Sequence, residues 1–204
     1  MKEQTQATGT PNPLAVLAFS LTLFVWSAFH AGYFDQATQE SFIIPLAVFF
    51  AAPMAGAAAM WALYRGDSYL ATAAGLFGAY WGSYGLLLWL TERGVVAAST
   101  SSGDIRGLLF ATWAVAFAIV WLGSIRQHWA MSLIALGAAV MFVFLSIAGY
   151  RDSENALKIA GWVGFVTAGL GAYFALAELL NTEFERVMLP TDLRGFGRLG
   201  QNTR

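Results

Sequence analysis

The sequence contains no cysteine and very little charge. Asp, Glu, Lys and Arg make up 11% of its 204 residues, whereas they supply about 25% of a typical soluble protein. Without cysteine the chain cannot form a disulfide, a thiol nucleophile or a cysteine-ligated metal site. So few charged side chains cannot cover the surface of a soluble domain, and a net charge of −1 offers no attraction to nucleic acid. We therefore expect neither an enzyme nor a nucleic-acid-binding protein.

Apolar residues are abundant instead. They make up 58% of the chain, against about 45–50% in soluble domains, and the mean hydropathy is +0.59. They gather in nearly uncharged stretches of about 20 residues, the helix length that crosses a hydrocarbon core of about 30 Å. Because lipid offers the backbone no hydrogen bonds, each stretch should be helical. The six stretches are Pro13–Phe34, Phe42–Leu63, Tyr69–Leu90, Gly107–Ile125, Trp129–Gly149 and Ile159–Ala177.

The predicted fold is therefore all-α, a polytopic membrane protein with six transmembrane helices. Residues 1–11 form a polar N-terminal tail, residues 12–180 the transmembrane domain, and residues 181–204 a polar, Arg-containing C-terminal tail. An even number of spans places both tails on one side of the membrane. That side carries more Lys and Arg than the other, chiefly through the C-terminal tail, so the positive-inside rule predicts cytoplasmic termini in the inner or plasma membrane.

Two helical stripes could line a path across the membrane. At 100° per residue, aromatic and polar side chains in each of two stretches share one face. They are Phe19, Thr22, Trp26, His30 and Tyr33 in the first stretch, and Phe77, Tyr80, Trp81 and Tyr84 in the third. Such stripes suit a narrow path with few polar groups. Core packing, with each polar group bonded by a neighbouring helix, would explain them equally well.

No Lys or Arg lies inside any of the six stretches. A path through them must therefore suit a neutral molecule, or an anion held briefly by hydroxyls, Trp N–H groups and His30. The two histidines, His30 and His128, are expected at opposite faces of the membrane, so they cannot ligate one haem iron. We expect no cofactor and no metal.

Proline and glycine give two expectations about helix geometry. Pro53 lies in the middle of the second stretch and lacks the N–H that would bond to the carbonyl of Phe49, which predicts a kink. Small residues at helical spacing suit close contact between helices. They include Gly78 and Gly82 in the third stretch, and Gly161, Gly164 and Gly169 in the sixth.

Short motifs stand at the two ends of the predicted bundle. The first stretch opens with Asn12-Pro13, followed by Leu14-Ala-Val-Leu17-Ala-Phe19, and closes with Gly32-Tyr33-Phe34. The last stretch ends in Glu178-Leu-Leu-Asn181, and Leu189-Pro190 follows. From Asn12 to Pro190 this pattern resembles the acetate uptake transporter family, the succinate–acetate permeases and their fungal acetate and ammonia transporter relatives. Its motif residues here are Asn12, Pro13, Glu178 and Asn181.

The resemblance implies six-helix protomers around a pore, gathered into a hexameric ring. It also implies that acetate or a related small monocarboxylate passes through each protomer, often coupled to protons. The family's pore is pinched by a Phe, a Tyr and a Leu from the first, third and fifth spans, and these positions hold Phe19, Phe77 and Ala138 here. Because Phe77 and Ala138 replace a Tyr and a Leu, we expect a pore that has lost one hydroxyl and gained volume.

We therefore predict a homo-oligomeric membrane transporter or channel for acetate or similar small monocarboxylates, which is proton-linked or passes the neutral acid. Phe19 and Phe77 would form the constriction, and Thr22, Trp26, His30 and Tyr80 would hold the solute. The expected partners are this carboxylate, the lipid bilayer and further copies of the chain, and no nucleic acid. An alternative is a non-transporting membrane subunit of a larger complex, because apolar pore residues also fit a plugged pore.

The six-span topology can be tested with single cysteines at Ser101 and Gln201, because the chain has no cysteine of its own. An impermeant thiol reagent should label the two positions from opposite sides of the membrane. Labelling of both positions from the same side would contradict the six-span model, which places three spans between them.

Overall fold

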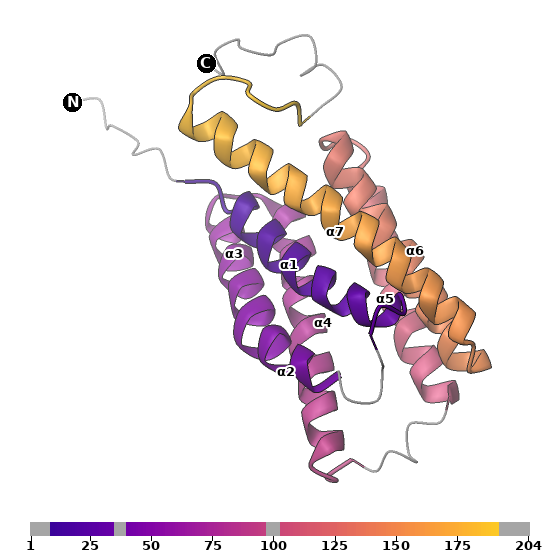
Figure 1. The fold of residues 1–204 in the computed structure, drawn as a ribbon. Coiled ribbons are helices and arrows are strands. Elements are labelled where there is room, and N and C mark those ends of the chain that lie inside the picture. The colour runs from indigo at the N-terminus through magenta and orange to yellow at the C-terminus, as the bar shows by residue number, and fades with distance from the viewer. Residues whose placement is uncertain (1–8, 35–39, 97–102, 192–204) are drawn as a thin grey trace.

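The computed structural model describes residues 9–34, 40–96 and 103–191, and within them the chain is helical without a strand (Figure 1). The all-α prediction is confirmed. The long helices are α1 (Asn12–His30), α3 (Ala52–Tyr64), α4 (Ser68–Glu92), α5 (Gly103–Ser124), α6 (Trp129–Arg151) and α7 (Glu154–Glu183). Ahead of α3 lie a short 3-10 helix, η2 (Glu40–Phe42), a helical turn, α2 (Ile43–Pro45), and a π-helical segment, η3 (Leu46–Ala51).

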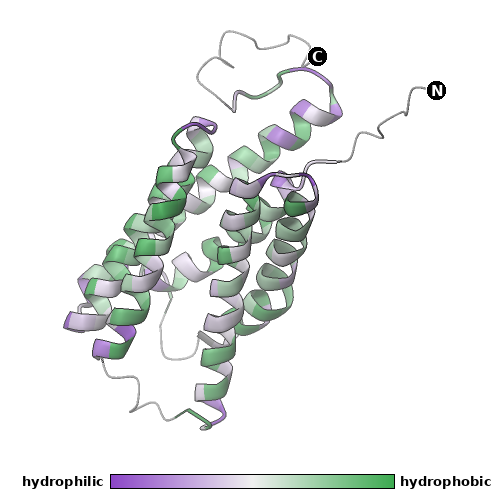
Figure 2. Cartoon of the chain, turned by 180° about the vertical axis from the view of Figure 1, so that it is seen from behind, coloured by the Kyte–Doolittle hydropathy of each residue, from purple (hydrophilic) through white to green (hydrophobic). Residues whose placement is uncertain are grey.

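Five of the described helical segments are long and apolar enough to cross a membrane: α1, Ile43–Tyr64, α5, α6 and α7. The predicted third span corresponds to α4, which has 25 residues. Its serines, threonines and tyrosines make it more polar than the other five. Figure 2 shows hydrophobic residues along the middle of the helices and hydrophilic residues near their ends. The described chain is thus a multi-pass bundle of the predicted kind.

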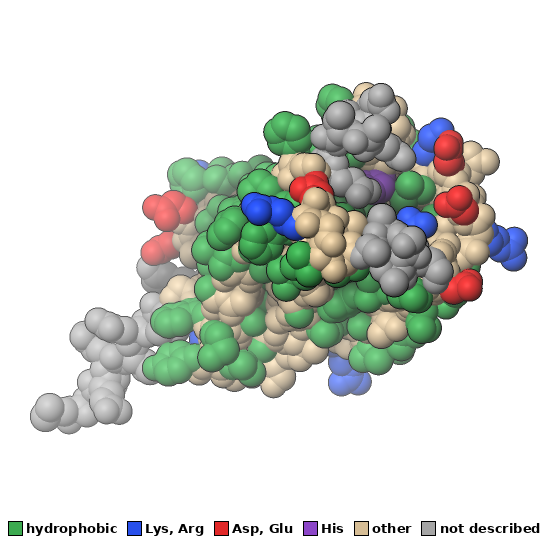
Figure 3. Space-filling view, turned by 90° about the horizontal axis from the view of Figure 1, so that it is seen from below, with side chains coloured by type: hydrophobic (Ala, Val, Ile, Leu, Met, Phe, Trp, Pro, Cys, Tyr) green, Lys and Arg blue, Asp and Glu red, His purple; other side chains and the backbone are tan. Residues whose placement is uncertain are grey.

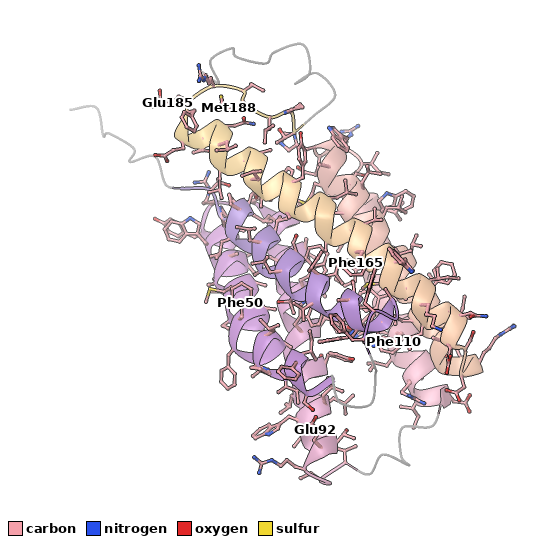
Figure 4. All side chains as sticks on the ribbon, viewed as in Figure 1. Phe50, Glu92, Phe110, Phe165, Glu185 and Met188 are labelled. Atoms are coloured by element: carbon pink, nitrogen blue, oxygen red, sulfur yellow. The ribbon has the colours of Figure 1, made fainter. Side chains whose placement is uncertain are left out.

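The beginning of α1 and the end of α7 lie at the same end of the bundle, which we call the terminal end (Figure 1). Figure 4 places Glu185 and Met188 at this end and Glu92 at the opposite end. Figure 3 looks at that opposite end, where acidic and basic side chains lie among hydrophobic ones. Ser101 and Gln201, the positions chosen for labelling, lie outside the described residues.

Two groups of helices meet at α1. In one group α5 packs chiefly on α6, and α6 on α7; in the other, α4 packs on η3 and α3. α1 packs mainly on α7 and also contacts η3, α3 and α4. The residues between the two groups are therefore placed by α1 on one side and by α4 and α5 on the other.

The chain before Pro53 changes its helix type. It widens into the π-helix η3 in the six residues that precede α3, and the N–H of Ala52 bonds to the carbonyl of Ala47, five residues earlier. The wider turn packs closely on Gly85 of α4, where an added Cβ would lie 2.8 Å from Val48 Cγ2. A π-helical turn absorbs the missing hydrogen bond without separating the two halves of the span.

Glycines on α7 let α1 approach closely, as predicted for Gly161 and Gly164. An added Cβ on Gly161 would collide with the backbone of His30 and Ala31, and one on Gly164 with Ser27 Oγ. Gly169, expected to make a similar contact, has no neighbour near its Cβ position. The close contact between α1 and α7 therefore depends on one face of α7.

This difference gives a matched pair of variants on one helix. Gly161→Ala should lower the free energy of unfolding by about 1–3 kcal/mol, because backbone atoms of α1 cannot move aside to accept a methyl group. Gly169→Ala should be neutral or stabilising, since alanine is favoured over glycine in a helix by about 0.5–1 kcal/mol. Thermal unfolding of both variants in detergent measures the difference, and an equal loss in both would contradict the packing described.

Candidate functional site

Helices α1 and α4 face each other in register and run in the same direction. The rings of Phe19 and Phe77 are in contact, with centroids 4.0 Å apart. Trp26 Nε1 donates a hydrogen bond to the hydroxyl of Tyr84 at 3.3 Å. Trp26 follows Phe19, and Tyr84 follows Phe77, by seven positions, which is about two turns. The two helices therefore keep one register over this whole length.

A cavity of about 40 Å³ opens on the terminal side of the Phe19–Phe77 contact. Side chains of α1, α4, α5 and α6 line it, and the hydroxyl of Tyr69 is the only polar side-chain group among them. The lining residues are Ala15, Val16, Phe19, Tyr69, Leu70, Ala73, Ala74, Phe77, Phe117, Val120, Met131, Ile134 and Ala135. None of them is charged, so the cavity suits an apolar or neutral molecule.

Polar groups stand on the other side of the two rings. Thr22 follows Phe19, and Tyr80 follows Phe77, by three positions. They therefore lie at one level, between the Phe19–Phe77 and Trp26–Tyr84 pairs. Both side chains are buried, at 0% and 2% exposure, and their hydroxyls have no hydrogen-bond partner among the described residues. The same holds for the indole N–H of Trp81. Buried polar groups usually have a partner, so these three are available to a solute.

Trp26 and His30 continue this stripe toward the end of α1. Their rings stack with centroids 3.9 Å apart, and His30 Nδ1 lies 2.9 Å from the carbonyl oxygen of Trp26. Tyr33, predicted on the same stripe, is not part of it, because α1 ends at His30 and the chain turns at Gly32 with φ +91°. Tyr33 is instead exposed and packs against Trp162 and Phe165.

The histidines lie at opposite ends of the bundle, as predicted. His30 is in the last turn of α1, whereas His128 precedes α6 at the terminal end, where its ring approaches Phe174. Among the described residues no three His, Asp or Glu side chains gather in a way that could hold a metal ion.

The fifth-span position predicted for the constriction, Ala138, is fully buried on α6 and does not line the cavity. Sequence reasoning missed Phe117 of α5, whose ring centroid lies 4.7 Å from that of Phe77. It also missed Phe142 of α6, which stacks on Phe117 and meets the ring of Tyr80 edge-on. Neither the helical stripes nor the resemblance pointed to a ring on α5.

The motif residues tie the terminal ends of the first and last helices together. Asn12 Nδ2 donates a hydrogen bond to Glu178 Oε2 at 3.3 Å. Asn181 Oδ1 accepts from the backbone N–H groups of Met188 and Leu189 at 2.6 and 3.0 Å, and its Nδ2 donates to the carbonyl of Leu189 at 2.7 Å. These residues hold the helix ends and the chain after α7, and they do not line the cavity.

Comparison with known proteins agrees with this architecture. The chain is 22% identical to the succinate-acetate/proton symporter SatP of Escherichia coli K12 over 180 residues, which cover 88% of this chain and 93% of that protein. It is 27% identical to acetate permease A of Emericella nidulans and 26% identical to ammonia transport outward protein 3 of Saccharomyces cerevisiae. These matches cover 88% and 84% of this chain, but only 64% and 62% of those longer proteins.

The fold is also that of a solved structure. The bacterial acetate channel SatP superposes with a TM-score of 0.84 over 90% of this chain and 99% of that chain, at 22% sequence identity. The GPR1/FUN34/yaaH family matches residues 1–192, nearly the whole sequence. The chain therefore belongs to the GPR1/FUN34/yaaH family.

Proposed function

We propose that this protein passes acetate or a similar small monocarboxylate across the membrane, as the neutral acid or together with a proton. One observation carries the proposal. An uncharged cavity ends at the Phe19–Phe77 contact, and the buried hydroxyls of Thr22 and Tyr80 stand directly behind it. A small neutral acid suits the uncharged cavity on one side of the rings, and once it has passed them its carboxyl group can bond to the hydroxyls on the other side. The names of the bacterial and fungal relatives support the same solute class.

The charge of the path favours the neutral acid over the bare anion. The residues that line the cavity, and the stripe from Thr22 to His30 behind it, contain no Lys or Arg. An anion would lose its hydration there without gaining a cation, which costs several kcal/mol in an apolar environment. A protonated acid avoids this cost and can both donate and accept a hydrogen bond.

The rings of Phe19 and Phe77 must move for a solute to pass. Their centroids, 4.0 Å apart, leave no opening between them. The backbones of the two helices are fixed by other contacts: α1 packs chiefly on α7, and α4 chiefly on α3. We therefore expect the contact to open by changes of side-chain rotamer while the two backbones stay in place.

The setting that we propose is the inner or plasma membrane, with both termini in the cytoplasm and several copies of the chain in a ring. The basic C-terminal tail supports this orientation. Large apolar side chains are exposed on the outside of all the long helices, and they suit contact with lipid or with another copy. A hexamer is the state that the family resemblance implies.

The closed Phe19–Phe77 contact also fits a second candidate function, a non-transporting membrane subunit whose pore is plugged. Purification separates the two candidates. A stable homo-oligomer that mediates acetate flux supports the transporter, whereas a chain that purifies only with fixed partners, and carries no flux, supports the subunit.

Uptake of radiolabelled acetate into liposomes that contain the pure protein tests the transporter directly. The protein-dependent part of the uptake, after subtraction of protein-free liposomes at each pH, should rise as the outer pH falls. Above the pKa of the acid the change should be about tenfold per pH unit, because the fraction of neutral acid changes by that factor. His30→Gln should be measured in parallel, since a histidine proton carrier would alter the profile.

A matched pair of variants controls for indirect effects. Ala74→Leu places a larger side chain in the cavity and should abolish most of the uptake, whereas Ala79→Leu lies on the exposed face of the same helix and should not. Uptake that follows the acetate anion concentration and ignores pH would overturn the neutral-acid or proton-coupled mechanism.

A further inference from the structure

We propose that Phe117 of α5 is the third member of the constriction and sets the length of acid that can pass, an inference that rests on the proposed function. Phe117 lines the cavity together with Phe19 and Phe77 and is only 1% exposed. Its ring centroid is 4.7 Å from that of Phe77. The three rings therefore close the same end of the cavity from three different helices.

Phe117 is held in place by the residues behind it. Its ring stacks on that of Phe142 of α6, with centroids 5.2 Å apart and an interplanar angle of 11°. Phe142 is fully buried and also meets Tyr80 at 4.8 Å. A ring fixed by such a stack has little freedom to turn, so Phe117 forms a rigid wall against which Phe77 must move.

The Phe117–Phe142 stack lies close in sequence to Ala138, the residue that the sequence predicts at the constriction. Ala138 precedes Phe142 by one helical turn on the same face of α6, and it is fully buried with only a methyl group. The sequence predicts extra space at this level of the pore. In this proposal Phe117, which stacks on Phe142 one turn beyond Ala138, closes the constriction from α5.

A rigid third ring limits how far the constriction can open. Phe77 already contacts Phe117, so its ring can leave Phe19 only by sliding along the face of Phe117, which limits the width of the gap. Acetate has a single methyl group, and each further methylene of a longer acid must fit the same gap. One methylene in a fitted apolar site changes discrimination by about 10–200-fold.

The test compares uptake of acetate, propionate and butyrate by the full-length protein in liposomes. Phe117→Ala should raise the ratio of butyrate to acetate uptake about tenfold, the low end of that range. Phe110→Ala is the matched control, because Phe110 lies seven residues earlier on α5 and also contacts Phe142, at 6.4 Å, but does not line the cavity (Figure 4). It should leave the ratio unchanged. Phe117→Leu, which preserves more of the packing, replaces Phe117→Ala if the latter does not fold.

A second readout does not depend on transport. In a Thr22→Cys variant the sole cysteine lies behind the three rings, so an impermeant thiol reagent from the terminal side should reach it slowly. Adding Phe117→Ala should raise the labelling rate, and adding Phe110→Ala should not. If the parent protein carries no acid at all, the proposed function fails, and labelling still decides the role of Phe117. A folded Phe117 variant with the parent's uptake ratio and labelling rate would overturn the inference.

Discussion

Inside a hydrocarbon layer, a hydroxyl or an indole N–H can bond only to other protein groups or to a solute that enters the layer. Three buried hydroxyls of α1, those of Ser20, Thr22 and Ser27, have no hydrogen-bond partner among the described residues, and they lie in different surroundings. Ser20 and Ser27 lie against Gly171 and Gly164 of α7, where small side chains allow close contact between the helices. Thr22 lies on the stripe that faces α4, at the level of Tyr80. One helix thus carries both the packing face that fixes it and the polar face of the proposed path.

The register of α1 on α4 makes this division possible. If α1 slid by one turn, Phe19 would leave Phe77 and Thr22 would no longer lie level with Tyr80. Two independent contacts prevent the slide: the ring pair at one end, and the Trp26–Tyr84 hydrogen bond seven residues further on. At the terminal end the Asn12–Glu178 hydrogen bond holds the first turn of α1 to α7. We therefore propose that Asn12 and Glu178 affect the path through the position of α1.

Much of the fold could be predicted from the spacing of charges, because charged residues are excluded from the hydrocarbon core. The boundaries were less accurate. α7 runs from Glu154 to Glu183, well beyond the predicted Ile159–Ala177, because a helix continues into the interface where its charged turns meet water. In its first turns Glu154 and Lys158 are exposed, and Lys158 Nζ lies 3.9 Å from Glu154 Oε2. The π-helix η3 has no sequence signal of its own beyond the proline that follows it.

The stripes on α1 and α4 could be predicted because helical periodicity depends on sequence alone. Phe19, Thr22, Trp26, Phe77 and Tyr80 lie together as that periodicity indicates. Tyr33 was misplaced because the end of α1 at His30 was not foreseen. Phe117 could not be predicted, since a single sequence does not say which rings of different helices meet. Its contact with Phe77 follows from the packing of α5 on α6 and of α4 on α5.

The central claim is that a small acid rests between the Phe19–Phe77 and Trp26–Tyr84 levels, bonded to the hydroxyls of Thr22 and Tyr80. Crystals of the protein grown with bromoacetate test it most directly, because bromine can be located by its anomalous scattering. Mass spectrometry of the dissolved crystals checks that none of the histidines and methionines has been alkylated. The account predicts a bromine peak between these two levels, within contact distance of Thr22 and Tyr80. A protein that transports bromoacetate, but whose bromine peaks all lie outside this stretch of the bundle, would contradict it.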